Sequence, residues 1–100
     1  MTSLHIVVLG AAAGGGFPQW NADSDACRRA RLGDPAAKSR TQASIAVSAD
    51  GRRWALLNAS PDLRQQILAN PAMWPKDGLR STPIAAVLLT NGDVDAIAGL

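Results

Sequence analysis

Three short polar side chains at alternate positions follow an apolar run near the end of the chain. They are Asn91, Asp93 and Asp95, and the run before them ends at Leu89. Oxygen ligands at alternate positions are typical of loops that bind hard cations. A calcium loop also needs glycine at its sixth position, where this sequence has Ala96, so a calcium loop is excluded. Two interpretations remain from the local sequence: a plain Asn-Gly turn, or a metal loop of another kind.

A second polar segment, NASPD at residues 58–62, also follows an apolar run. In α/β folds, binding sites lie in loops at the carboxyl ends of strands, so two such loops favour a site. We expect Asn58, Ser60 and Asp62 to be candidate substrate-binding residues. Ser60 has a competing structural role, because it suits the N-cap of a helix whose first residue is Pro61.

A glycine-rich segment, GAAAGGGFPQWN at residues 10–21, follows the first apolar run. Its glycine spacing matches neither the Rossmann fingerprint nor the P-loop, and no lysine follows it as a P-loop requires. The segment therefore predicts a tight chain reversal, in which backbone closely approaches backbone or a ligand. Phe17 and Trp20 beside it have two alternative roles, as a local core or as a stacking surface for a substrate.

Two further chemistry-bearing residues are isolated. Cys27 is the single cysteine, so it forms no internal disulfide and belongs to no thiolate cluster. His5 stands within the first apolar run, and we expect a structural role for it rather than metal binding.

Strands and helices must position these loops. β-Branched apolar runs predict strands, and Asp50-Gly51 between two of them predicts a hairpin. Leu63, Ile67 and Leu68 line one face of a helix that ends before Asn70-Pro71. We expect strands at residues 4–9, 44–48, 53–57 and 84–89, the first and last of them buried, helical turns near residues 28–32, a helix from residue 61 and a helix start at residues 95–100. This order predicts an α/β fold.

Composition bounds the class of protein. One hundred residues, 47% of them apolar, suit one small domain. The net charge is +2, and no aromatic residues interleave with the arginines, which argues against a nucleic-acid partner. No stretch approaches the roughly 20 apolar residues that span a bilayer, and no cationic residue precedes the first apolar run as in a signal peptide. We expect a soluble, cytoplasmic protein without membrane insertion.

Three longer segments carry a family resemblance. They are IVVLGAAAGGGFPQWN, RTQASIAVSADGRRWALLNASPDLRQQI and PIAAVLLTNGDVDAIAGL, and they closely resemble the coenzyme PQQ synthesis protein B family of the metallo-β-lactamase superfamily. The resemblance extends from Leu4 to Leu100 and implies the superfamily's four-layer αββα sandwich. Because members of that family are longer, it implies that residues 1–100 are the N-terminal part of a single metallo-β-lactamase-like domain, with the remainder absent.

The resemblance also implies a metal site. The superfamily's His-x-His-x-Asp-His motif aligns with Asn91, Asp93, Asp95 and Ala96. This implies metal binding by Asp93 and Asp95, with Asn91 as a weaker candidate, and iron(II) as the metal with zinc as the alternative. Alanine cannot coordinate a metal, so Ala96 weakens metal binding by this chain. Relatives also carry a cysteine cluster suited to structural zinc, of which only Cys27 is present here.

The function implied by the resemblance is the synthesis of pyrroloquinoline quinone (PQQ). The enzymatic interpretation is a metal-dependent hydroxylation of a cross-linked Glu–Tyr precursor derived from a peptide. The alternative is a non-catalytic binding or transport protein for PQQ or its precursor, which Ala96 favours. The expected partners are this small-molecule or peptide-derived precursor and a second copy of the chain in a homo-oligomer. No catalytic residue is assigned by the sequence.

Overall fold

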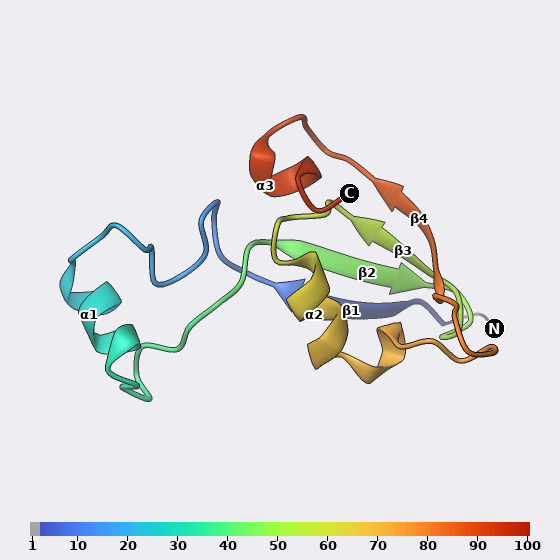
Figure 1. The fold of residues 1–100 in the computed structure, drawn as a ribbon, viewed down its shortest axis with the longest axis horizontal. Helices are drawn as coiled ribbons and strands as arrows, with labels where there is room; N and C mark the ends of the chain where they lie inside the picture. The colour runs from blue at the N-terminus through green and yellow to red at the C-terminus, as the bar shows by residue number, and fades with distance from the viewer. Residues whose placement is uncertain (1–2) are drawn as a thin grey trace.

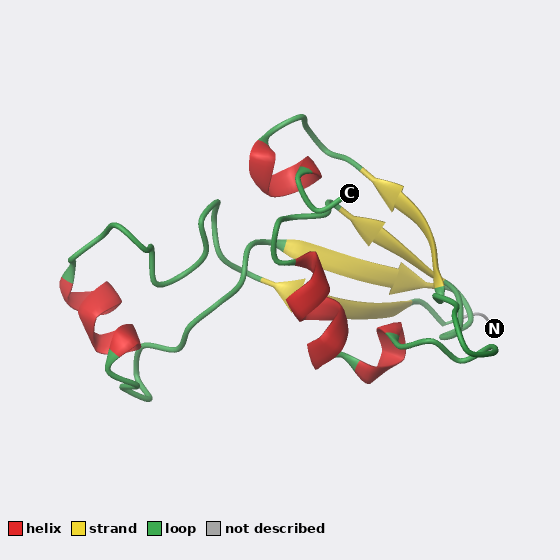
Figure 2. Ribbon diagram, in the orientation of Figure 1, coloured by secondary structure: helices red, strands yellow, loops and turns green. Residues whose placement is uncertain are grey.

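The computed structural model describes residues 3–100, which form a mixed sheet with short helices (Figures 1 and 2). The sheet has the strand order β1-β2-β3-β4. Its strands are β1 (His5–Gly10), β2 (Ser44–Ser48), β3 (Trp54–Leu57) and β4 (Ile84–Leu88). The helices are α1 (Asp25–Arg31), α2 (Leu63–Ala69), the 3-10 helix η1 (Pro71–Met73) and α3 (Val94–Ile97). The predicted α/β fold is confirmed.

Three of the four strands point in one direction. Both β1 and β3 run antiparallel to β2, and β4 runs parallel to β3. The arrowheads of β1, β3 and β4 therefore lie at the same edge of the sheet (Figure 2). The loops that follow these strands all leave from that edge.

The predicted hairpin joins β2 to β3. Gly51 has a φ of 75°, in the left-handed region that glycine tolerates. Oδ1 of Asp50 accepts hydrogen bonds from the backbone N–H groups of Arg52 and Arg53, at 2.8 and 3.0 Å. These bonds, the one from Arg53 first, stabilise the ionised carboxylate and lower the pKa of Asp50 to about 2. The carboxylate of Asp50 thus fixes the turn.

The core lies on the face of the sheet that α2 and η1 cover. Its buried members are Leu9, Ala46, Trp54, Leu56 and Met73, and Leu63 and Ile67 of α2 pack against them. The ring of His5 lies edge-on to Trp54, with 6.5 Å between the centroids, which agrees with the structural role expected for this histidine.

The face of α2 differs from the prediction at one position. Leu68 is 55% exposed, whereas Gln66 is 2% exposed. Residues three and four apart share a helix face, so Gln66 and Ile67 join Leu63 on the covered side and Leu68 points away. The prediction placed Leu68 inside because it is apolar, but the buried position is filled by a polar side chain with specific partners.

The second face of the sheet is open within residues 3–100. Ile6, Val8 and Leu88 are 58%, 63% and 58% exposed, so the prediction that β1 and β4 are buried strands was wrong for this face. Side chains alternate between the faces of a strand, and the described helices cover one face only. The αββα architecture predicts a second sheet over this open face.

Residues 19–40 form an excursion that projects beyond the sheet edge and carries α1 (Figure 1). Its base is closed by two backbone hydrogen bonds of 2.8 Å between Phe17 and Arg40. The helix begins earlier than the predicted turns near residue 28, because Ser24 acts as its N-cap and accepts from the N–H of Cys27 at 3.2 Å. A hydrogen bond between the Ser24 side chain and the Cys27 thiol itself lowers the pKa of that thiol. Trp20 is 84% exposed, so it belongs to no local core within the described residues.

Candidate functional site

The candidate site lies where three loops meet at the carboxyl ends of β1, β3 and β4. They are the glycine loop (residues 11–19), the NASPD loop (residues 58–62) and the acidic loop (residues 89–93), which leads directly into α3. The sequence analysis predicted that the NASPD loop and the acidic loop contribute to one site. The sequence analysis did not predict that the glycine loop lies beside these two loops. It reaches the same edge because β1 and β3 both run antiparallel to β2, and the sequence does not reveal that pairing.

Asn58 connects the ends of β3 and β4. Its backbone N–H donates to the carbonyl of Leu88 at 2.8 Å, and its Oδ1 accepts from the N–H of Thr90 at 2.9 Å. Its Nδ2 also donates to Oγ1 of Thr90 at 2.9 Å. Asn58 has a φ of 69°, a left-handed conformation that asparagine tolerates better than most residues. The amide is therefore engaged in holding the acidic loop, and its contact with a substrate stays a prediction.

Ser60 does not cap the helix as predicted. The helix begins at Leu63, and Asp62 holds the N-cap position without a side-chain bond. Oγ of Ser60 instead accepts from the N–H of Asp62 at 3.1 Å, in a turn that precedes the helix. The carboxylate of Asp62 does not cap the helix either and is bonded to Gln42. Ser60 is fully buried, and substrate contact by Ser60 or Asp62 stays a prediction.

A polar network joins the glycine loop to the NASPD loop. Oδ2 of Asp62 accepts from the N–H of Gln42 at 2.9 Å and from its Nε2 at 3.1 Å. Oε1 of Gln42 accepts from the N–H of Gly15 at 2.9 Å. Nε2 of Gln66 donates to the carbonyl of Gln42 at 2.8 Å. Gln42 and Gln66 are both buried, and sequence reasoning missed them because no local motif marks them.

The acidic loop and the first turn of α3 contain the predicted metal ligands. Oδ1 of Asn91 accepts from the N–H of Asp93 at 2.9 Å, which forms the Asn-Gly turn that the local sequence left open. Asp93 is exposed and precedes α3 at its N-cap position. Asp95 is half-buried, and a Cβ on Gly14 would lie 3.4 Å from its carboxyl carbon. The glycine loop therefore forms a wall against Asp95.

Ala96 is buried beneath the NASPD loop. It is 2% exposed, and its carbonyl accepts from the N–H of Ala59 at 2.7 Å. The carbonyl of Ala59 in turn accepts from the N–H of Gly99 at 2.8 Å. A Cβ on Gly99 would overlap the carbonyl oxygen of Ser60. The backbone of α3 thus packs directly on residues 59 and 60, and Ala96 contributes a methyl group where the motif has an imidazole.

The described residues do not form a metal site by themselves. Residues 3–100 contain no cluster of three or more His, Cys, Asp or Glu side chains that could hold an ion. Asp93 and Asp95 remain as carboxylate donors, while the amide oxygen of Asn91 is already bonded within the turn. Cys27 lies in α1, in the excursion beyond the sheet. A complete ligand set would need donors from outside this part of the chain.

Comparisons with known proteins agree with this fold. The sequence model of the β-lactamase superfamily domain matches residues 53–100. The crystal structure of Zn(2+)-bound PqqB from Methylobacterium extorquens superposes with a TM-score of 0.92 at 63% identity, over 97% of this chain and 34% of that one. A diphosphatase from the PhnP family superposes with a TM-score of 0.70 at 28% identity, over 97% and 33% of the two chains. The fold and the matched segment define a member of the β-lactamase superfamily.

Within that superfamily the sequence relatives are more specific. The chain is 67% identical over 97 residues to coenzyme PQQ synthesis protein B of Methylorubrum populi and to that of Gluconacetobacter diazotrophicus. In both cases the match covers 97% of this chain and 32% of the relative. The chain belongs to the coenzyme PQQ synthesis protein B family, and it spans about a third of the length of the curated relatives it matches.

The helices of the described region are short. None between residues 3 and 100 has the length and apolar character needed to cross a membrane.

Proposed function

We propose that this chain acts in the synthesis of PQQ, as part of a longer protein. The observation that carries the proposal is 67% identity over 97 residues to relatives named for that pathway. The fold alone would not decide the function, because a diphosphatase superposes on the same chain. The specificity must therefore come from the loops at the carboxyl edge of the sheet.

The finer proposal is a metal-dependent, iron-requiring hydroxylation of the Glu–Tyr precursor at this edge. A relative crystallised with Zn(2+) supports the presence of a metal in the family. Asp93 and Asp95 are the carboxylates that this chain would contribute, with Gly14 leaving space beside Asp95. The network of Gln42 and Asp62 would hold the facing loops in place and needs no metal to form.

The rival proposal is a non-catalytic binding or transport protein for PQQ or its precursor. The observation that favours it is Ala96, whose buried methyl group replaces the last histidine of the motif. Under this proposal the three loops would form a binding surface, and the loss of a ligand would not impair function. A cytoplasmic location and a homo-oligomeric state are compatible with both proposals.

Metal titration separates these proposals. In the full-length protein we expect weak anaerobic binding of iron(II), and binding at least about tenfold tighter in Ala96→His, since even a partner that only orients a ligand contributes about that much. Asp95→Ala in the Ala96→His background should remove the gain. A parallel titration with zinc shows whether the site selects iron. Equal, tight binding in all three proteins would place the metal elsewhere.

The Ala96→His variant needs a stability control because residue 96 is buried. A thermal unfolding curve without metal shows whether the imidazole is accommodated. Incubation with the precursor then gives the second readout, a mass gain of one oxygen atom. Binding of the precursor without any such gain, in both the original and the Ala96→His protein, would favour the carrier over the enzyme.

A further inference from the structure

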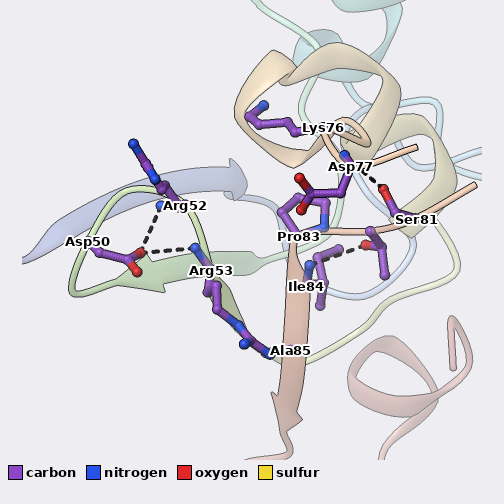
Figure 3. Close-up of a pocket in the computed structure, with 10 residues that line it drawn as sticks. Asp50, Arg52, Arg53, Lys76, Asp77, Ser81, Pro83, Ile84 and Ala85 are labelled. Atoms are coloured by element: carbon purple, nitrogen blue, oxygen red, sulfur yellow. Dashed lines mark hydrogen bonds between the residues drawn. The ribbon is translucent and has the colours of Figure 1, made fainter. Parts of the chain in front are cut away.

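A cavity lies at the opposite edge of the sheet from the three loops. It has a volume of about 600 Å³ and opens between the β2–β3 turn and the connection that leads into β4. Figure 3 shows the two walls: Asp50, Arg52 and Arg53 on the turn, and Lys76, Asp77 and Ser81 on the connection. The cavity is at the amino ends of β3 and β4, so it shares no residue with the candidate site described above.

The two walls are held in a defined relationship. The N–H of Trp54, at the start of β3, donates to the carbonyl of Pro83 on the connection at 2.9 Å. On one wall, the carboxylate of Asp50 fixes the turn through its bonds to two backbone N–H groups. On the other wall, the N–H of Asp77 donates to Oγ of Ser81 at 3.3 Å. The cavity is thus built from bonded backbone on both sides.

Its cations are free of carboxylate partners. The ion pairs among residues 3–100 involve Arg28 and Arg29 of α1, and none involves Arg52, Arg53 or Lys76. Asp50 accepts from the backbone of the arginines and not from their guanidinium groups. Nζ of Lys76 donates to one carbonyl, which leaves ammonium donors for a ligand. Each wall therefore contributes at least one cation that forms no ion pair with a carboxylate among residues 3–100.

We propose that this cavity binds a small organic polycarboxylate that carries a hydroxyl group. The side chains of Arg52 and Arg53 extend in different directions from the turn (Figure 3), so each guanidinium group can take one carboxylate. A ligand with two or more carboxylates spans the walls, with one carboxylate taken by an arginine of the turn and another by Lys76. The carboxylate of Asp77, which also lines the cavity, accepts a hydrogen bond from the hydroxyl group and disfavours ligands without such a donor. This site is independent of the proposed function at the other edge.

Paired probes test the proposal in the full-length protein. Citrate and tricarballylate differ by one hydroxyl group, and their affinities are measured by calorimetry alongside inorganic phosphate. We expect citrate to bind several-fold more tightly than tricarballylate, and its binding to weaken as salt rises from about 20 mM to about 200 mM. Equal binding of citrate and phosphate would overturn the polycarboxylate assignment.

Three variants locate the binding. Arg52→Gln combined with Arg53→Gln should weaken citrate binding at least about tenfold. Asp77→Asn should remove the preference for citrate over tricarballylate. The matched control is Arg28→Gln combined with Arg31→Gln, which removes the same two positive charges from α1 and should leave citrate binding unchanged. Absence of citrate binding at low salt, or equal loss in the control, would overturn the proposal; circular dichroism verifies that each variant is folded.

Discussion

The side-chain amide of Asn58 joins the ends of the two parallel strands β3 and β4 by bonding both the N–H and the hydroxyl of Thr90. Asn58 also adopts a left-handed backbone conformation to do so. We expect Asn58→Ala to lower the free energy of unfolding of the full-length protein by about 2 kcal/mol. The substitution removes the side-chain hydrogen bonds to Thr90, and alanine tolerates a positive φ less well than asparagine does. Urea unfolding measures this change.

Two control variants separate the amide from the backbone at Asn58. Asn58→Gly relieves the conformation but lacks the amide, so it should lose less stability than Asn58→Ala. Asn58→Asp keeps an acceptor for the N–H of Thr90 and should also lose less. If all three variants matched the original protein, Asn58 would not hold the acidic loop, and its assignment as a substrate contact would gain weight.

A second prediction concerns the packing of α3 on the NASPD loop. A Cβ on Gly99 would overlap the carbonyl oxygen of Ser60, and two backbone segments would have to separate. Gly99→Ala should therefore cost about 2 kcal/mol of stability. The control is Gly92→Ala, since a Cβ at Gly92 meets no atom within 4 Å. Similar unfolding midpoints for the two variants would contradict the close approach.

The β2–β3 turn predicts a defined pH dependence. The pKa of Asp50 is depressed from 3.8 to about 2 in the fold, so its stabilising contribution is present above about pH 4 and is lost as the pH falls toward 2. Asp50→Asn lacks this contribution. The difference in urea midpoint between the original protein and the variant should shrink between pH 4 and pH 2. A difference that is constant over this range would show that the carboxylate is not the group that fixes the turn.

The open face of the sheet predicts the behaviour of residues 1–100 alone. Large apolar side chains are exposed on this face, among them Leu4 at 67% and Val8 at 63%. Exposed apolar strands promote association between chains. We expect the isolated residues to aggregate or to remain partly unfolded, as judged by light scattering and thermal unfolding. A monomer with a sharp, cooperative transition would be inconsistent with this expectation.

The local features of the fold were predictable because short-range chemistry determines them. Asp50-Gly51 between two apolar runs predicted the hairpin, and the order of apolar runs predicted the strands within a residue or two. The errors arose where a distant residue changed the local outcome. Ser60 was expected to cap a helix from residue 61, but the helix begins at Leu63, and Asp62 at its N-cap position bonds Gln42, 20 residues away.

The candidate site was predictable in part for the same reason. Asn91, Asp93 and Asp95 were identified from spacing. The structure places Asn91 and Asp93 in the loop that follows β4, and Asp95 in the first turn of α3. Ala96 is buried against Ala59, 37 residues away, and Gly14 lies beside Asp95, 81 residues away. No local pattern encodes either relationship. Gln42 and Gln66 are likewise recognisable only once their partners are in place.

The most direct test of the central claim is the amount of PQQ that a bacterium makes. A PQQ-producing strain that lacks its own PQQ synthesis protein B is supplied with the full-length protein containing this chain, and PQQ in the culture is measured by mass spectrometry. The family assignment predicts that PQQ returns above the level of the deletion strain, whether the protein acts as an enzyme or as a carrier. PQQ that stays at the deletion level while folded protein accumulates in the cells would contradict it.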